Sequence, residues 1–328
     1  MTNNLAFAID FADIKAAEKR IEEHVIRTPV VSAPLINQRF GCTIFHKCEN
    51  LQHVGAFKAR GACNAVFSLS PEQAAAGVVA HSSGNHAAAL ARAATLRAID
   101  AHIVMPRNSA QVKIDAVRGF GVEPRFCEPT AEARQAMADE VIAETGATFV
   151  HPYNNSHVMA GQGTAALELL QQASDLDAII APVGGGGLLS GTLVAVKAAN
   201  PNIKVFAAEP AWADDAFRSL ASGKIEPAVR YDTIADGLRT PLGDLTFPVI
   251  QKLVEDVLLV DERSIEIATK VYICDGKLAV EPSGAVPLAA LMSNQSMFAG
   301  QRVGLIISGG NAEPEAWARI LQTPLQDE

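Results

Sequence analysis

The first informative absence in this 328-residue sequence is a long apolar run, because charged residues interrupt every extended hydrophobic stretch. Positive charge is also scarce: 27 lysines and arginines stand against 36 aspartates and glutamates, giving a formal net charge of −9. A chain with no basic excess is a poor partner for nucleic acid or anionic lipid. We therefore expect neither a membrane span nor a nucleic-acid partner.

The cysteines also lack a pattern. There are five, an odd number, and none has the spacing of a metal site or a redox pair. We expect small buried side chains in a reducing compartment. The N-terminus shows no basic segment followed by an apolar one, so no signal peptide is predicted and a cytoplasmic location is expected.

What the sequence does contain is an alternation of strand and helix patterns, in a chain that is 49% hydrophobic and 19% charged. We predict strands at residues 43–48, 77–81, 101–105, 122–127, 147–150, 178–183, 205–208 and 303–307. We predict helices at residues 11–25, 85–97, 110–119, 131–145, 158–174, 188–200, 264–274 and 284–293. Such alternation predicts an α/β fold with mostly parallel sheets. Continuous apolar strands such as 303–307 predict sheets covered on both faces.

The chain shows no internal repeat, low-complexity segment or flexible linker. The predicted division is a large domain built from residues 1–66 and 152–328, with a small mobile domain at residues 67–151. A site would then lie in the cleft between them, at the carboxyl ends of strands.

Lys58 lies between an aromatic residue, Phe57, and the small residues that open a helix. A lysine held against apolar neighbours loses hydration, so its pKa falls and its neutral amine can form a Schiff base with a carbonyl. Most lysines at a helix start are solvated charges. A chemical role for Lys58 therefore depends on its companions elsewhere in the chain.

The strongest companion is the run Gly184, Gly185, Gly186 and Gly187, between a buried strand and a helix. Consecutive glycine N–H groups together with a helix start can form a cradle for phosphate. The run lacks the spacing and the following Lys-Ser/Thr pair of a nucleotide-hydrolysing loop. A tight turn that needs glycine is the alternative.

Two further loops follow strands. Residues 82–86 open a helix, and the N–H groups of Ser83, Gly84 and Asn85 suit a carboxylate, although an ordinary helix cap explains them too. The Asn85 amide can also donate to a phenolate oxygen. Ser308 places a neutral hydroxyl at the end of the last strand, where ligands of open α/β sheets bind.

An acidic loop follows the strand that ends at Glu209. Asp214 and Asp215 come a few residues later, and carboxylates together with loop carbonyls can coordinate a hard cation. A solvated acidic loop with a helix cap is the alternative.

Taken together, these pieces resemble the pyridoxal-phosphate enzymes of the serine/threonine dehydratase and serine racemase family, which includes 3-hydroxyaspartate dehydratases. The resemblance covers nearly the whole chain and rests on residues 56–62, 82–86, 160–164, 184–187, 235–237, 281–284 and 308–311. It implies the tryptophan-synthase-β type of fold (fold type II), with two three-layer α/β domains. It also explains why one chain holds both a phosphate cradle and a desolvated lysine, since the cofactor is an aldehyde that carries a phosphate.

The resemblance implies a role for each matching residue. Lys58 would hold pyridoxal phosphate as a Schiff base and move the Cα proton, and Ser83 matches the second proton carrier of the racemase branch. The other cofactor contacts would be Phe57, Asn85, Gly184, Gly185, Gly186, Gly187 and Ser308. A hydroxyl such as that of Ser308, facing the ring nitrogen, makes a weaker electron sink than a carboxylate would, which favours direct loss of a β-hydroxyl.

The resemblance also implies substrate and metal contacts. The substrate would meet Ser82, Ser83, Gly84, His86, Arg134 and Arg239. A structural Mg²⁺ (or Ca²⁺ or Mn²⁺) would be held by Glu209, the carbonyl of Ala213, and Asp215. A homodimer is expected on the same ground.

The sequence departs from the family pattern at Ala56, where a serine is usual, and at His53-Val54, where a basic residue and threonine are usual. Arg239, with His53 or Arg134, can accept a second carboxylate, which would favour 3-hydroxyaspartate as substrate. Arg239 is equally explained as a solvated loop residue.

The predicted function is that of a lyase: a dehydratase that removes water and ammonia from L-serine, L-threonine or 3-hydroxyaspartate to give a 2-oxo acid. Serine racemase is the alternative. A transferase of the cysteine-synthase kind ranks low, because His86 stands where that group usually has threonine. A non-enzymatic phosphate-binding module is the remaining hypothesis.

Overall fold

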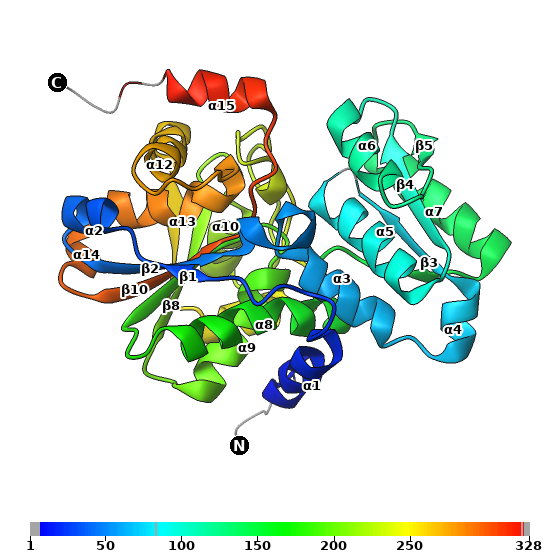
Figure 1. Ribbon diagram of the computed structural model, residues 1–328, viewed down its shortest axis with the longest axis horizontal. Coiled ribbons are helices and arrows are strands. Elements are labelled where there is room, and N and C mark those ends of the chain that lie inside the picture. Colours follow the sequence, from blue (N-terminus) through cyan, green and yellow to red (C-terminus); the bar gives the residue numbers. More distant parts are fainter. Residues whose placement is uncertain (1–6, 83, 323, 325–328) are drawn as a thin grey trace.

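The structure, a computed structural model, describes residues 7–82, 84–322 and 324. Its strands form two separate sheets, and helices pack against both (Figure 1). The prediction of an α/β fold with mostly parallel sheets is confirmed. No helix in the described part of the chain is long and apolar enough to cross a membrane. The five cysteines are all free thiols.

The larger sheet has six strands in the order β1-β2-β10-β7-β8-β9. All neighbours are parallel except the edge strand β1, which pairs antiparallel with β2. The strands are β1 (Val30–Val31), β2 (Thr43–Cys48), β7 (Ala178–Pro182), β8 (Lys204–Pro210), β9 (Asp256–Val260) and β10 (Arg302–Ile307).

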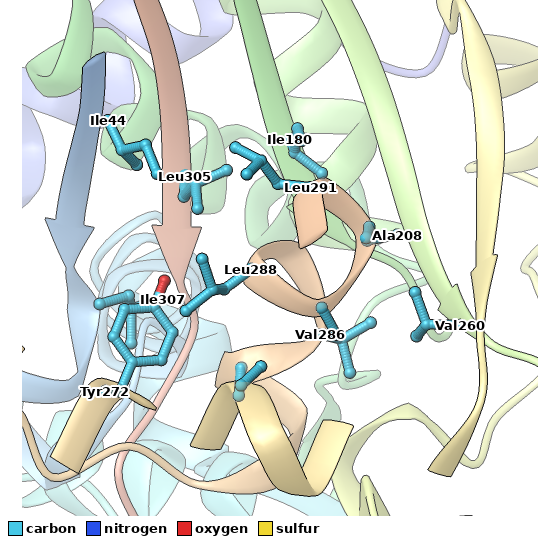
Figure 2. Close-up of a cluster of buried hydrophobic side chains, with 14 of the residues drawn as sticks. Ile44, Ile180, Ala208, Val260, Tyr272, Val286, Leu288, Leu291, Leu305 and Ile307 are labelled. Carbon is cyan, nitrogen blue, oxygen red and sulfur yellow. The ribbon is translucent and has the colours of Figure 1, made fainter. Parts of the chain in front are cut away.

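Alternate residues of this sheet face two different layers of helices. Ile180, Ala208 and Leu305 lie in a core with α12 (Glu262–Cys274) and α13 (Pro282–Ser293), as Figure 2 shows. Their strand neighbours Ile179, Ala207 and Ile306 lie in a second core with α8 (Ser156–Gln172) and α9 (Gly187–Ala199). The sheet is therefore covered on both faces, which explains its continuous apolar strands.

The smaller sheet has four parallel strands in the order β5-β4-β3-β6. They are β3 (Val78–His81), β4 (Ala101–Pro106), β5 (Arg125–Cys127) and β6 (Thr148–Phe149). One face packs on α3 (Lys58–Phe67), α5 (Asn85–Arg97) and α6 (Gln111–Arg118), and the other packs on α7 (Ala131–Thr145). All four strands lie within residues 67–151, and the proposed domain division at those residues stays a prediction.

Several boundaries differ from the sequence-based prediction. The first helix ends at Ile21 and not at 25, since residues 22–25 form a turn. The strands expected at 122–127 and 147–150 shrink to β5 and β6. Short or partly exposed elements were not predicted: α2 (Pro34–Phe40), α4 (Pro71–Ala76), α10 (Asp215–Ser222), α11 (Phe247–Leu253), α14 (Gln295–Phe298), β1 and β9. The remaining elements are α1 (Phe11–Ile21), α15 (Pro314–Leu321), and the 3-10 turns η1 (Glu49–Leu51), η2 (His53–Gly55) and η3 (Asp236–Leu238).

Helices α3 and α8 cross at glycines. A Cβ on Gly161 would lie 2.7 Å from the Cα of Gly61 and 2.7 Å from the carbonyl oxygen of Arg60. A Cβ on Gly61 would lie 2.5 Å from the Gln162 side chain. The two backbones therefore touch, and the helix that begins at Lys58 is held directly against the helix that follows residue 155.

Candidate active site

Lys58 is the first residue of α3, and its Nζ donates a hydrogen bond to the carbonyl oxygen of Pro152 at 2.7 Å. The ammonium lies 5.1 Å from the centre of the Phe57 ring. Burial lowers the pKa of Lys58 to about 8, and the nearby Glu281 opposes that shift. The neutral fraction near neutral pH is thus far larger than that of a solvated lysine, and a nucleophilic lysine needs the neutral form.

The segment that carries Lys58 is joined to the end of β10. The N–H of Phe57 donates to the carbonyl of Ser308 at 3.0 Å, and Ala56 forms an isolated antiparallel bridge with Gly309. Ser308 is only 3% exposed. Two candidate residues from opposite ends of the chain, Lys58 and Ser308, therefore lie on paired backbone segments.

The glycine run follows β7 and opens α9, as its sequence position predicts. Gly186 has φ +87, a left-handed conformation that favours glycine. A Cβ on Gly185 would lie 2.3 Å from the Tyr153 ring, and one on Gly187 would lie 3.0 Å from the Cβ of Tyr153. The loop thus has no side chains of its own and packs against Tyr153, and its backbone N–H groups at the start of a 13-residue helix fit a phosphate group.

The start of α5 is brought to the segment that follows β10. The Asn85 Oδ1 accepts a hydrogen bond from the Asn311 Nδ2 at 2.9 Å. Ser82 donates from its backbone N–H to the Val104 carbonyl at 3.1 Å, and its hydroxyl accepts from the N–H of Gly84 at 3.3 Å. Ser83 lies outside the described residues.

His86 is turned inward. It is 2% exposed, and its Nε2 lies 2.9 Å from the carbonyl oxygen of Val150. Burial, and after it the charge of Lys58, lowers the pKa of His86 to about 3, so the imidazole is neutral. Its Nδ1 is buried without a hydrogen-bond partner. A substrate contact would have to use that nitrogen.

The two arginines predicted to bind substrate each bond a nearby carbonyl. Arg134, on α7, donates from Nε to the Thr130 carbonyl at 3.2 Å. Arg239 is exposed, and its Nε donates to the Thr233 carbonyl at 2.8 Å.

The candidate metal ligands lie at the end of β8 and the start of α10. Both oxygens of Glu209 accept backbone N–H groups, from Ala216 at 2.7 Å and Phe217 at 2.9 Å. Asp215 accepts from the Leu242 N–H at 3.0 Å through Oδ2, while its Oδ1 is buried without a partner. Burial raises the pKa of both carboxyls, that of Asp215 to about 7.

The unpartnered Oδ1 of Asp215 fits a divalent cation, because the cation would compensate a buried negative charge. Two carboxylates and the Ala213 carbonyl would leave other coordination positions to water. Among the described residues, no group of three or more histidine, cysteine, aspartate or glutamate side chains could hold a metal.

Glu281, at the N-cap of α13, is a site residue for which the sequence analysis assigned no role. Its carboxyl accepts hydrogen bonds from the Asn85 amide and from the N–H of Asn311. A signal was present: Glu281 is the only charged residue between Leu278 and Ser293.

Comparison with known proteins gives the class to which this arrangement belongs. A family model described as pyridoxal-phosphate dependent enzyme matches residues 21–309, and the chain belongs to that family. The amine beside a side-chain-free phosphate cradle is what such a cofactor requires.

The relatives narrow the class. The chain is 47% identical to a serine racemase of Dictyostelium discoideum over 317 residues, covering 95% of this chain and 98% of the relative. It is 46% identical to a beta-hydroxyaspartate dehydratase of Paracoccus denitrificans over 303 residues, covering 92% and 96%. The structure of maize serine racemase superposes with a TM-score of 0.93 at 46% identity, covering 95% of this chain and 97% of that one.

The chain is thus a pyridoxal-phosphate enzyme of the serine racemase and dehydratase family, with the tryptophan-synthase-β-like fold. The family resemblance, the fold class and the cofactor are confirmed. The individual site residues, the metal and the homodimer stay predictions.

Proposed function

We propose that this enzyme racemises L-serine and, in a competing reaction on the same substrate, removes water and ammonia to give pyruvate. The sequence analysis ranked dehydration first. We reverse that order, because the likeness to serine racemases, in sequence and in structure, covers slightly more of the chain than the likeness to the dehydratase.

The observation that carries the proposal is the convergence at the end of β10. The Asn85–Asn311 hydrogen bond of 2.9 Å brings Asn85, which follows Ser83 by two residues in the sequence, to this strand end. The bond from the Phe57 N–H to the Ser308 carbonyl, 3.0 Å long, brings Lys58 to it. Racemisation needs two proton-carrying groups on opposite faces of one carbon atom, and Lys58 and Ser83 are the pair we propose.

Pyridoxal phosphate, when bound, supplies the electron sink that makes the Cα–H bond of an amino acid acidic. Lys58 would take that proton at Nζ, in a form that burial keeps partly neutral, and the Pro152 carbonyl would hold the resulting ammonium. Ser83 would deliver a proton to the other face. Return by Ser83 gives the opposite enantiomer, and return by Lys58 gives back the starting one.

The chain also offers residues to hold the cofactor. Gly184, Gly185, Gly186 and Gly187 would bind the phosphate through backbone N–H groups, and Phe57 would pack beside the ring. Asn85 would donate to the phenolic oxygen, and the Ser308 hydroxyl would face the ring nitrogen. A neutral partner at that nitrogen favours loss of the substrate's β-hydroxyl, which accounts for dehydration as the competing reaction.

Glu209, the Ala213 carbonyl and Asp215 would bind Mg²⁺, Ca²⁺ or Mn²⁺ in a structural role. The ion would neutralise two buried carboxylates at the start of α10 and so fix the loop that follows β8. The unpartnered Oδ1 of Asp215 supports this assignment.

The direct test is to load the protein with pyridoxal phosphate, add L-serine, and measure D-serine and pyruvate separately. Both products are expected from the wild type. A Ser83→Ala variant should lose D-serine formation and keep pyruvate formation from L-serine, because only the first needs a donor on the second face. Equal loss of both products would contradict the assignment of Ser83, and absence of D-serine from the wild type would contradict racemisation.

A second candidate is dehydration of 3-hydroxyaspartate, favoured by the 46% identity to the Paracoccus dehydratase. Turnover of each 3-hydroxyaspartate isomer, compared with L-serine at equal concentration, separates the two. A preference for a hydroxyaspartate isomer by more than about tenfold in kcat/KM would make that compound the substrate.

A further inference from the structure

Glu281 is a buried carboxyl group that the proposed function does not use. It is 5% exposed, and among the described residues no lysine or arginine forms an ion pair with it. A buried carboxyl without a paired cation is costly and needs hydrogen-bond donors. Glu281 finds them in two amides from separate parts of the chain.

The first donor is the side chain of Asn85, whose Nδ2 lies 3.2 Å from Oε1 and 3.4 Å from Oε2 of Glu281. The second is the backbone N–H of Asn311, 3.0 Å from Oε2. Asn311 also donates from its own Nδ2 to the Asn85 Oδ1 at 2.9 Å. Both ends of the Asn85 amide are therefore held, the nitrogen by Glu281 and the oxygen by Asn311.

The chemistry of the two groups makes this arrangement depend on a proton. An ionised carboxylate can only accept hydrogen bonds, so it selects the NH2 end of the Asn85 amide. A protonated carboxyl can donate, so it also tolerates the oxygen end. The two Glu281 oxygens lie nearly equidistant from Nδ2 and can share one of its hydrogens, which leaves the second N–H for a ligand.

We propose that Glu281 is a positioning residue for pyridoxal phosphate, whose ionisation fixes the Asn85 amide with an N–H directed at the cofactor's phenolic oxygen. The inference rests on the proposed function, since it takes the cofactor to bind against Asn85. Glu281 acts through Asn85 and need not contact the cofactor itself.

The electrostatics of the cluster place this change within the physiological range. Burial, and then the charge of Asp236, raises the pKa of Glu281 to about 7, while Lys113 opposes the shift. The charged groups that face Glu281 are Lys58 of α3, Asp236 of η3 and Lys113 of α6, and the last two form a 2.7 Å ion pair. Because the ionised fraction grows as pH rises through that value, Glu281 selects the NH2 end of the Asn85 amide at slightly alkaline pH and loses that selectivity below it, while Asn311 still donates to the Asn85 Oδ1.

The first experiment observes Asn85 directly in the cofactor-free protein. With asparagine labelled with ¹⁵N, the side-chain amide resonance of Asn85 is assigned by its loss in Asn85→Ala. We expect that resonance to move with pH in the wild type, with a midpoint near neutrality, and to stop moving in Glu281→Gln. A resonance that does not titrate in the wild type, or that titrates unchanged in Glu281→Gln, would overturn the inference.

The second experiment measures cofactor affinity from the visible absorbance of bound pyridoxal phosphate. Glu281→Gln should bind it about tenfold more weakly at slightly alkaline pH, the loss expected when one hydrogen bond to a charged oxygen is misdirected. In an Asn85→Ala background the same substitution should have no further effect, because Glu281 acts through Asn85.

Glu262→Gln is the matched control, since Glu262 also accepts a backbone N–H, from Ile234 at 2.7 Å, and does not touch Asn85. It should bind the cofactor like the wild type. If Glu281→Gln does not fold, Glu281→Asp, which keeps the charge on a shorter arm, takes its place in the affinity experiment and should show the same weakened binding. In the resonance experiment Glu281→Asp should displace the midpoint and not abolish the titration, because aspartate also ionises.

The outcomes separate the two proposals. A wild type that binds no pyridoxal phosphate would overturn the proposed function and this inference together. A wild type that binds and turns over serine, with Glu281→Gln equal to it in affinity, would overturn the inference alone. The same tenfold loss in the Asn85→Ala background would also overturn it, because Glu281 would then act by another route.

Discussion

Helix α3 carries two cations two residues apart, Lys58 partly buried and Arg60 fully buried, and they lie in opposite electrostatic surroundings. Arg60 is fully buried and makes paired hydrogen bonds of 2.7–2.9 Å to both Glu49 and Glu168. Lys47 joins the same network through Glu168 and the Thr28 carbonyl. Lys58, by contrast, donates to one neutral carbonyl, that of Pro152.

The difference separates a structural cluster from a chemical one. Two cations and two carboxylates pair in this network, which ties β2, α3 and α8 together. Lys58 and Glu281 have no such partners, and burial moves the pKa of each toward neutrality, to about 8 and about 7. Groups that titrate near working pH are the ones that can move protons.

The largest expected effect is on Lys58. Lys58→Ala should lower the rates of serine racemisation and dehydration by about 10⁴-fold, since it removes both the attachment point of the cofactor and a proton carrier. The thermal unfolding temperature of this variant should equal or exceed that of the wild type, because a poorly solvated amine is removed. A rate within tenfold of the wild type would contradict the role of this lysine.

Lys47→Ala should show the reverse pattern. Removal of one partner leaves Glu168 underpaired in the interior, which typically costs about 3–5 kcal/mol of unfolding free energy. Urea denaturation of the cofactor-free protein measures this. The double variant Lys47→Met with Glu168→Gln, which leaves Arg60 an acceptor at position 168, should recover much of that loss, and a double variant as unstable as Lys47→Ala would show that the charges are not the cause.

An intermediate effect is expected at Asp215, another buried carboxyl without a cation. Because its folded-state pKa of about 7 exceeds the ordinary 3.8, the cation-free folded chain holds a proton that the unfolded chain has released. The stability contributed by this group is therefore greatest below about pH 4 and is lost as pH rises to about 7.

A saturating concentration of Mg²⁺ or Ca²⁺ should restore about 1–3 kcal/mol at slightly alkaline pH, seen as a rise in Tm. Asp215→Asn should weaken the pH trend, to which Glu209 and Glu281 also contribute, and should abolish the cation effect, while Asp214→Asn serves as a neighbouring control. Stabilisation by the cation that persists in Asp215→Asn would place the ion elsewhere.

The smallest effect is expected at Arg239, an exposed arginine that bonds the Thr233 carbonyl. Arg239→Ala should change kcat/KM for L-serine by less than about threefold. A much larger loss confined to 3-hydroxyaspartate would revive the idea that this guanidinium binds a second carboxylate.

The contrast between Lys58 and the network around Arg60 also explains which features could be predicted from the sequence. Local signals mark three parts of the site. Lys58 is an amine beside small residues, and the glycine run and the Ser308 segment are glycines after apolar strands. The structure brings these three segments together. The role of Glu281 could not be predicted, because it depends on Asn85 and Asn311 meeting from distant parts of the chain. The buried network was missed for the same reason: in the sequence, Lys47, Arg60 and Glu168 look like ordinary surface charges.

Misplaced elements have similarly local causes. β1 has two residues and pairs only at the edge, so no alternation could form. The family resemblance implied a substrate contact for His86, which stays a prediction: its Nε2 lies against the Val150 carbonyl, and its Nδ1 has no hydrogen-bond partner.

The touching backbones at Gly61 and Gly161 have a consequence for how this enzyme can diversify. Adding even one methyl group there would force the two helices apart and carry the reactive amine away from its acceptor. Changes of substrate must therefore come from loops around the site, such as residues 235–240. The crossing of α3 and α8, which positions Lys58, has to stay the same.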